Sequence, residues 1–409
     1  MPVLKARWVL PIDGPPIENG AIAWDGPLIR FVGPAGDAPI PVTVDYGDAV
    51  IMPGLINAHT HLELSDLAGQ VAPSPPLHEW LLRIVAVTGN SGRSEETIAA
   101  AARQGARASL AAGVTTVGDI TRHPAITRPV LSHCGLRAVS FGEITAVGSR
   151  RDLLKTRLEA ARRSLERNPG GRIRVGLSPH APYSVEPAGL AACAAVADCA
   201  ALPLAIHLAE SREEAEFTAA RSGPLVDLLK RIGAWDEAVP VNGCGPVEVA
   251  QRAGLLTRRT VIAHANYAGE PDIARIARGG SSVAYCPRTH AAFAHPPHPF
   301  DRMLSAGVNL CIATDSPASA PSLSPMDEIA FLLDRRADCE PSTLLEMITI
   351  RAARALGLDR KIGTLAPGKH ADLAVFPFRA RGRFDPGEFI RSLPRAQGVF
   401  VDGESVPLA

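Results

Sequence analysis

The feature that most constrains the fold is a repeated alternation of two kinds of segment through the middle of the chain. Stretches rich in Ala, Leu, Arg and Glu, typical of helices, lie between short apolar runs typical of buried strands. The runs cover residues 49–61, 114–119, 136–143, 173–180, 204–207, 261–264, 282–286 and 308–315, and the helical stretches include 94–112, 153–167, 187–199, 212–219 and 271–278. This pattern predicts repeated βα units around a parallel sheet, and eight strands are what a (β/α)₈ TIM-type barrel requires.

Both ends of the chain have a different pattern. Short strand-like segments punctuated by Gly and Pro occur at 6–11, 20–24 and 28–33, and again at 371–376 and 396–401. We therefore expect a small β-sandwich domain built from residues 1–52 and 365–409, and a barrel over 53–364.

Charge and cysteine usage narrow the function classes. The 42 acidic and 42 basic residues cancel, which argues against nucleic acid or a membrane surface as partner and favours a small-molecule substrate. The 7 cysteines include no Cys-x-x-Cys pair, so reduced thiols and a cytoplasmic location are expected. The first 16 residues lack the apolar run of a signal peptide, and no segment reaches transmembrane length.

Nearly every strand-like run ends in a residue that can bind a metal or move a proton. In chain order these are His59 and His61, Asp119, Glu143, His180, His207, His264, Cys286 and Asp315. Any one of them is most simply a structural residue with a hydrogen-bond partner. Because barrel enzymes carry their active sites at the carboxyl ends of the strands, the set together indicates a site.

His59 and His61 are two residues apart, so on a strand their side chains face the same way. Together with His207 and Asp315 they would form a set of three imidazoles and one carboxylate, suited to Zn²⁺ or Fe²⁺ with a position left for water. A divalent metal lowers the pKa of a bound water from about 16 to near 7, so hydroxide is available at neutral pH. Asp315 can also accept the proton of that water.

Glu210 follows His207 by three residues, where the chain leaves the strand. Its carboxyl group can act as a proton shuttle, or it can be a carboxylate favoured by the N-terminus of the next helix. His264 can orient the attacking water.

Several motifs resemble one enzyme family. They are Pro53–His61 (PGLINAHTH), Gly113–Val117 (GVTTV), His180–Ser184 (HAPYS), His207–Glu210 (HLAE), Ala263-His264, Cys286–Arg288 (CPR), Thr314–Ser316 (TDS) and Gly363–Leu373 (GTLAPGKHADL). In these the chain resembles the amidohydrolase superfamily, in its branch of mononuclear aminohydrolases and chlorohydrolases.

That resemblance covers essentially the whole chain and implies a barrel, a composite β-sandwich and a homodimer. It also implies metal ligands at His59, His61, His207 and Asp315, a proton shuttle at Glu210 and a water-orienting His264. Related two-metal barrels carry a modified lysine at the end of the fourth strand. Here that strand ends at His180 with no lysine nearby, so one metal ion is expected.

The segment His207–Glu210 is similar to that of purine and nucleoside deaminases, in which metal-bound hydroxide attacks C6 of an adenine-like ring and ammonia leaves. The continuation His59–Ser65 (HTHLELS), followed by Trp80, is most similar to aminodeoxyfutalosine deaminases of the menaquinone pathway, which convert 6-amino-6-deoxyfutalosine to futalosine and ammonia. Deaminases of S-adenosylhomocysteine and methylthioadenosine usually continue differently after the second histidine.

Other functions stay open from the sequence. The substrate could be S-adenosylhomocysteine, methylthioadenosine or adenosine, or the enzyme could be a guanine or triazine aminohydrolase or chlorohydrolase. A catalytically dead barrel that serves as a binding scaffold is the non-enzymatic alternative. A scaffold would have no physical need for the six intact catalytic residues, which are His59, His61, His207, Glu210, His264 and Asp315.

Five residues are candidates for substrate contacts: Glu63, Trp80, His180, Arg288 and His290. If the strand continues past His61, Glu63 faces the same way as His61, and it either binds a substrate amine or hydroxyl or holds a histidine ligand in place. His180 would meet the sugar or side arm, and Trp80 either packs a helix or stacks on a substrate ring. Arg288 either binds a substrate carboxylate, such as that of a benzoate-bearing nucleoside, or lies at the surface.

The segment around His290 departs from the pattern of the family. Where the branch commonly has Cys-Pro-x-Ser-Asn, this chain reads Cys286-Pro287-Arg288-Thr289-His290. His290, His295 and His298 lie in a Pro-rich loop whose spacing fits neither strand nor helix. We expect this loop to be a lid or a substrate wall that contributes His290, and not a second metal site.

Overall fold

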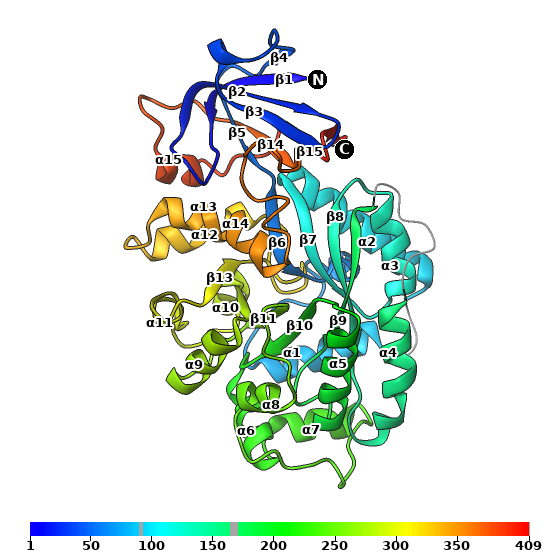
Figure 1. Ribbon diagram of the computed structural model, residues 1–409. Coiled ribbons are helices and arrows are strands. Elements are labelled where there is room, and N and C mark those ends of the chain that lie inside the picture. Colours follow the sequence, from blue (N-terminus) through cyan, green and yellow to red (C-terminus); the bar gives the residue numbers. More distant parts are fainter. Residues whose placement is uncertain (90–92, 164–170, 409) are drawn as a thin grey trace.

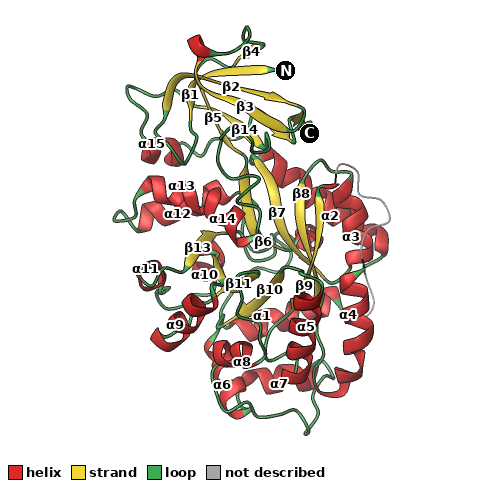
Figure 2. Ribbon diagram, in the orientation of Figure 1, coloured by secondary structure: helices red, strands yellow, loops and turns green. Residues whose placement is uncertain are grey.

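The computed structural model describes residues 1–89, 93–163 and 171–408. Its larger unit is a sheet of 8 parallel strands whose spatial order follows the chain order. The strands are β6 (Leu55–Thr60), β7 (Val114–Thr121), β8 (Arg137–Ile144), β9 (Ile173–Pro179), β10 (Leu204–Leu208), β11 (Thr260–His264), β12 (Ser282–Tyr285) and β13 (Asn309–Ile312). Helices surround this sheet, as Figures 1 and 2 show, which confirms the predicted (β/α)₈ barrel.

The helices follow the predicted stretches closely. Ser94 caps α2 (Glu95–Ala111) by accepting a hydrogen bond from the amide of Thr97, and α5 (Pro187–Cys199) and α9 (Glu270–Gly279) also form. The helix expected over 153–167 begins as α4 (Leu154–Arg162), and residues 164–170 lie outside the described residues. Among the described residues, no helix combines the length and apolar character needed to cross a bilayer.

The second sheet contains strands from both ends of the chain. Its N-terminal strands are β1 (Val3–Val9), β2 (Ile17–Asp25), β3 (Leu28–Pro34), β4 (Val44–Asp45) and β5 (Ala49–Pro53), and its C-terminal strands are β14 (Leu373–Pro377), β15 (Gly398–Val401) and β16 (Glu404–Ser405). The two sets join where β5 and β14 pair antiparallel, with Val375 opposite Ile51. The expectation of a β-unit assembled from both termini is therefore confirmed (Figure 1).

The run 49–61 is divided between the two sheets, and not one strand as the sequence indicated. β5 belongs to the terminal sheet and β6 opens the barrel, with Gly54 between them. A Cβ atom at Gly54 would lie only 2.1 Å from Cγ2 of Thr115, so glycine permits the close approach of the two chain segments there.

Side chains join the first and last barrel strands. Asn57 of β6 donates from Nδ2 to Oγ1 of Thr314 (2.8 Å), and its Oδ1 accepts from the Thr314 amide (3.1 Å). The amide of Asp315 donates to the carbonyl of His59 at 3.2 Å. We call this junction of β6 with residues 314–315 the closing seam.

Replacing Asn57 with alanine should weaken the closing seam. The substitution removes both hydrogen bonds from a fully buried residue and leaves the Thr314 amide without its partner, while the Thr314 hydroxyl still donates to the carbonyl of Asp315, so the free energy of unfolding should fall by about 2–3 kcal/mol. Chemical denaturation followed by circular dichroism measures this change. The same substitution at Asn242, in the loop between α7 (Pro224–Arg231) and α8 (Pro246–Arg252), is the control; equal effects at both positions would contradict the role of the seam.

Candidate metal centre

Four histidines and one carboxylate meet at the carboxyl ends of the barrel strands. Ligand atoms of His59, His207 and His264 form one group within 4.8 Å of one another, and those of His59, His61 and Asp315 form another. Nε2 of His59 lies 3.5 Å from Oδ1 of Asp315, and Nε2 of His61 lies 3.6 Å from the same oxygen. The structure thus brings together all four predicted ligands.

Contacts with neighbouring strands orient two of the ligands, His61 and His207. Asp119, two residues before the end of β7, accepts the amide hydrogen of Leu62 with its carboxylate (2.9 Å) and so holds the turn after His61. Nδ1 of His207 lies 3.2 Å from the carbonyl of His180, which leaves Nε2 of His207 for the cluster.

Asp315 reaches the cluster with one oxygen already engaged. Asp315 follows β13, and its φ of 59° lies in the left-handed region, which is unusual for a residue with a side chain. Ser319 donates to Oδ2 of Asp315 at 2.6 Å, so Oδ1 is the oxygen that faces the imidazoles.

The electrostatics suit a divalent cation. Burial lowers the pKa of His61 to about 4 and that of His264 to about 3, and it holds the pKa of His207 well below its usual range. These rings are therefore neutral near pH 7 and carry free lone pairs. Burial would raise the pKa of Asp315, but the neighbouring imidazoles of His59 and His61 hold it below its usual value.

A divalent metal fits this donor set. Nε2 of His59 is a buried nitrogen without a hydrogen-bond partner among the described residues, which is costly unless a ligand binds it. Three imidazoles and one carboxylate are donors that zinc and iron accept. Glu143, His180 and His207 make a further group within 4.8 Å, which shares His207 with the first.

Glu210 is held beside the cluster by its own backbone. Its amide donates to Oε2 of Glu214 (2.9 Å), and its carbonyl accepts from Nδ2 of Asn266 (3.1 Å). Oε1 of Glu210 lies 3.5 Å from Nε2 of His264. Burial, with the charges of Asp315 and Glu214, raises the pKa of Glu210 well above its usual value, so this carboxyl group can hold a proton near neutral pH.

The alternative role considered for Glu210, a carboxylate at a helix N-terminus, describes its neighbours Glu213 and Glu214 better than Glu210 itself. Helix α6 (Arg212–Ala220) begins after Ser211, whose hydroxyl accepts from the amide of Glu214, and the first turn contains Glu213 and Glu214. Glu210 precedes this cap and its side chain lines the cavity.

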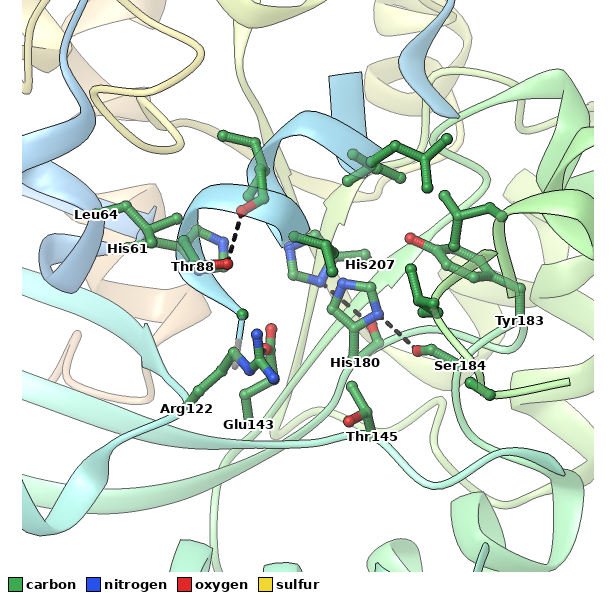
Figure 3. A pocket seen from close by; sticks show the side chains of 18 of the residues that line it. His61, Leu64, Thr88, Arg122, Glu143, Thr145, His180, Tyr183, Ser184 and His207 are labelled. Atoms are coloured by element: carbon green, nitrogen blue, oxygen red, sulfur yellow. Dashed lines mark hydrogen bonds and ion pairs between the residues drawn. The ribbon is translucent and has the colours of Figure 1, made fainter. Parts of the chain in front are cut away.

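A cavity of about 560 Å³ opens over the cluster. The sequence-predicted residues that line it are His61, Glu63, Trp80, His180, His207, Glu210, His264 and Asp315. Figure 3 shows His180 beside His207, with its ring bonded to Ser184, and the two ring centroids are 4.9 Å apart. Trp80, on α1 (Leu77–Thr88), also packs edge-on against Phe293.

Glu63 reaches the cavity by a different route from the one considered. The strand ends at Thr60, and Glu63 lies on the 3-10 helix η2 (Leu62–Leu67). Its buried carboxylate accepts from the Thr121 hydroxyl (2.6 Å) and the Arg122 amide (3.1 Å), and it lies 3.1 Å from Nδ1 of His123. These contacts offset burial and lower the pKa of Glu63.

Two predicted substrate residues lie elsewhere. Arg288 donates from Nε to Oε1 of the buried Glu328 (2.6 Å) and from Nη2 to the Ser322 hydroxyl (2.9 Å). Nε2 of His290 lies 2.9 Å from the carbonyl of Pro296. Neither side chain is among the described residues that line the cavity, so the structure does not bring Arg288 or His290 to the substrate.

Comparison with known proteins agrees with this architecture. The model of the amidohydrolase family matches residues 50–406. The chain belongs to the amidohydrolase family. The prediction that it is a hydrolase is thereby confirmed.

Three named proteins are similar to this amidohydrolase in sequence or in structure. A 5-methylthioadenosine/S-adenosylhomocysteine deaminase of Moorella thermoacetica is 32% identical over 416 residues, which cover 98% of this chain and 91% of the relative. The structure of the aminofutalosine deaminase of Helicobacter pylori with methylthio-coformycin superposes with a TM-score of 0.86 at 22% identity and covers 100% of both chains. A zinc-bound adenosine deaminase of Xanthomonas campestris has a TM-score of 0.81 at 25% identity and covers 98% of this chain and 92% of its own.

Five arginines of this amidohydrolase line the cavity without having been identified from the sequence, namely Arg93, Arg122, Arg150, Arg157 and Arg231. Arg122 and Arg157 also line one smaller cavity together, and burial, followed by the charges of Arg122 and Arg150, lowers the pKa of Arg157. Glu143 is the carboxylate beside them, with Oε2 3.9 Å from Nε of Arg122. Arg122 and Glu143 lie on one side of His180 in Figure 3. Arg122 follows the end of β7 by one residue, so the strand-end rule could have found it.

Proposed function

We propose that this protein is a metal-dependent hydrolytic deaminase of an adenine nucleoside derivative, with zinc as its metal ion. The observation that carries the proposal is the convergence of the ligand set with Glu210, whose buried carboxyl group has a raised pKa and lies only 3.5 Å from Nε2 of His264. The named relatives are deaminases of adenosine-like substrates, which supports the same reaction.

The chemistry divides among the residues as follows. A bound divalent ion supplies the Lewis acidity that makes water nucleophilic at neutral pH. Oδ1 of Asp315, whose pKa is low, accepts a proton from the attacking water, and Nε2 of His264 orients that water. Oε1 of Glu210 gives its proton to the adjacent ring nitrogen as the bond from water oxygen to C6 forms. Asp315 then passes its proton to the amino group, so the C6–N bond breaks and ammonia leaves. The Glu210 carboxylate takes the proton of the C6 hydroxyl as the C6–O double bond forms, so one water is consumed and both carboxyl groups return to their starting states.

For the substrate we propose 6-amino-6-deoxyfutalosine, converted to futalosine in menaquinone synthesis. Its benzoate carboxylate would find cations at Arg122, Arg150 and Arg157, where Glu143 is the neighbouring acid. Burial raises the pKa of Glu143 to about 7, so it neutralises the arginines only in part. His180 would face the sugar, and Trp80 would close the apolar wall.

The relative from Moorella favours a second substrate, S-adenosylhomocysteine, whose amino-acid end also carries a carboxylate. Methylthioadenosine and adenosine lack such a group. Ammonia release should therefore be measured across aminodeoxyfutalosine, S-adenosylhomocysteine, methylthioadenosine, adenosine and guanine. The proposal expects the highest kcat/KM with aminodeoxyfutalosine. A preference for a neutral nucleoside contradicts the substrate, and no ammonia from any of the five contradicts the deaminase.

Arg122→Gln tests the proposed carboxylate contact. Loss of one charge-assisted hydrogen bond worth about 1.5–3 kcal/mol should raise KM for aminodeoxyfutalosine roughly 10- to 100-fold and leave KM for methylthioadenosine unchanged. Steady-state kinetics with both substrates measures the split. Arg83→Gln is the matched control, because Arg83 bonds to Ser74 at the outer side of α1. Equal KM changes for both substrates would rule out a carboxylate-specific role.

A further inference from the structure

His298 contacts the backbone of His264 from outside the cavity. It lies in the loop between α10 (Pro287–Ala292) and α11 (Phe300–Ser305). Nε2 of His298 is 2.9 Å from the carbonyl oxygen of His264, the last residue of β11. Its ring also stacks on Tyr285, with centroids 3.9 Å apart and an interplanar angle of 20°. One side chain thus joins the loop after β12 to the end of β11.

The direction of this hydrogen bond is defined by its chemistry. Burial lowers the pKa of His298 to about 3, so the ring is neutral near pH 7 and carries one hydrogen. Because a carbonyl oxygen only accepts, that hydrogen is on Nε2. Nδ1 is then a bare, buried nitrogen without a hydrogen-bond partner among the described residues. The single N–H of His298 is committed to His264.

The accepting carbonyl belongs to an unusual turn. His264 and Ala265 have φ values of 70° and 54°, a left-handed conformation that residues with side chains adopt only when their surroundings hold them there. The amide of Ala265 donates to the carbonyl of Leu208 (3.0 Å), and that of Tyr267 donates to the carbonyl of Ala209 (2.8 Å). These bonds hold the amides after the turn, whereas the bond from His298 holds the carbonyl of His264 itself.

We infer that His298 is a positioning residue, whose N–H holds the turn after β11 so that the imidazole of His264 faces Glu210 and the metal cluster. The inference rests on the role proposed above for His264. The imidazole needs such support because its Nε2 is 3.5 Å from Oε1 of Glu210 and its ring centroid is 5.3 Å from that of His59. Small displacements of a positioned group cost large factors in rate.

Two substitutions separate the hydrogen bond from the packing. His298→Phe keeps an aromatic ring against Tyr285 but has no N–H, whereas His298→Gln offers an amide N–H near the position of Nε2. With the substrate that the ammonia assay identifies, His298→Phe should lower kcat about tenfold or more and change KM less than about twofold. His298→Gln should restore kcat to within about threefold of the wild-type value.

A second measurement does not depend on activity. Hydrogen exchange in the metal-free protein, followed by mass spectrometry over residues 260–268, should be faster in His298→Phe and near the wild-type rate in His298→Gln. His295→Phe is the control, since that loop histidine contacts the Tyr267 hydroxyl (3.2 Å) and not the His264 carbonyl.

The outcomes distinguish the inference from the proposed function. Wild-type kcat and wild-type exchange in His298→Phe would overturn the inference, and so would equal losses in the Phe and Gln variants. If the wild-type protein released no ammonia from any tested substrate, the proposed function would fail, while the exchange rates would still report whether His298 holds the turn.

Discussion

Glu210→Gln should retain its metal ion and lose turnover by roughly 10²- to 10⁴-fold, the usual contribution of a positioned proton donor. The amide can still donate a hydrogen bond from a nearly identical position, but it cannot deliver a proton to the ring nitrogen. Burial raises the pKa of Glu210, which favours the protonated carboxyl group, and the substitution removes that proton donor. Steady-state ammonia release gives kcat, and elemental analysis gives metal per chain.

Glu213→Gln is the appropriate comparison for this variant. Glu213 is an acidic neighbour in the first turn of α6, but its Oε1 contacts Nδ1 of His78 (3.2 Å) and it does not line the cavity. It should turn over at close to the wild-type rate. Comparable activity in Glu210→Gln and Glu213→Gln would mean that Glu210 moves no proton in the slow step.

His207→Ala should lose metal and activity together. His207 lies between the other imidazoles, with ring centroids 5.0 Å from His59 and 5.4 Å from His61, so its removal deletes a central donor. Even residues that only support a ligand change metal affinity about 10- to 100-fold, and we expect a larger loss here. Elemental analysis after dialysis, with kcat measured before and after added zinc, tests both parts.

The control for His207→Ala is an exposed histidine. His133, after α3 (Pro124–Ser132), interacts with the Pro129 carbonyl at 2.8 Å and should tolerate alanine without loss of metal. A His207→Ala protein that still holds one ion per chain after dialysis and remains active would remove His207 from the ligand set.

The strand-end residues were predictable because they obey a local rule. Alternation along a strand predicts that His59 and His61 face the same way, although β6 ends at Thr60 and His61 is the residue after it. A parallel barrel gathers the carboxyl ends of all its strands at one rim. His207, His264 and Asp315 follow from the same rule, and for this reason the structure brings the whole predicted ligand set together.

Contacts that depend on tertiary partners were not predictable in this way. Arg288 was a reasonable carboxylate binder by its place after a strand, but buried Glu328, forty residues later on α12 (Pro325–Arg335), binds its guanidinium. Glu63 depended on the strand continuing beyond Thr60, and the chain instead turns into η2. The arginine cluster draws Arg122 and Arg157 from different βα units, so no local pattern relates them.

The closing seam has a consequence for how the protein is made. Asn57 and Thr314 are separated by 257 positions, and the metal cluster spans the same junction, with His59 on one side and Asp315 on the other. A nascent chain therefore exposes its first two histidines on the ribosome long before their carboxylate partner is synthesised, and it cannot complete the centre until the last barrel strand has docked. Metal acquisition is therefore expected late in biogenesis. A bound ion would link the first strand of the barrel to the segment after the last strand, so its affinity would depend on the folding of the whole barrel.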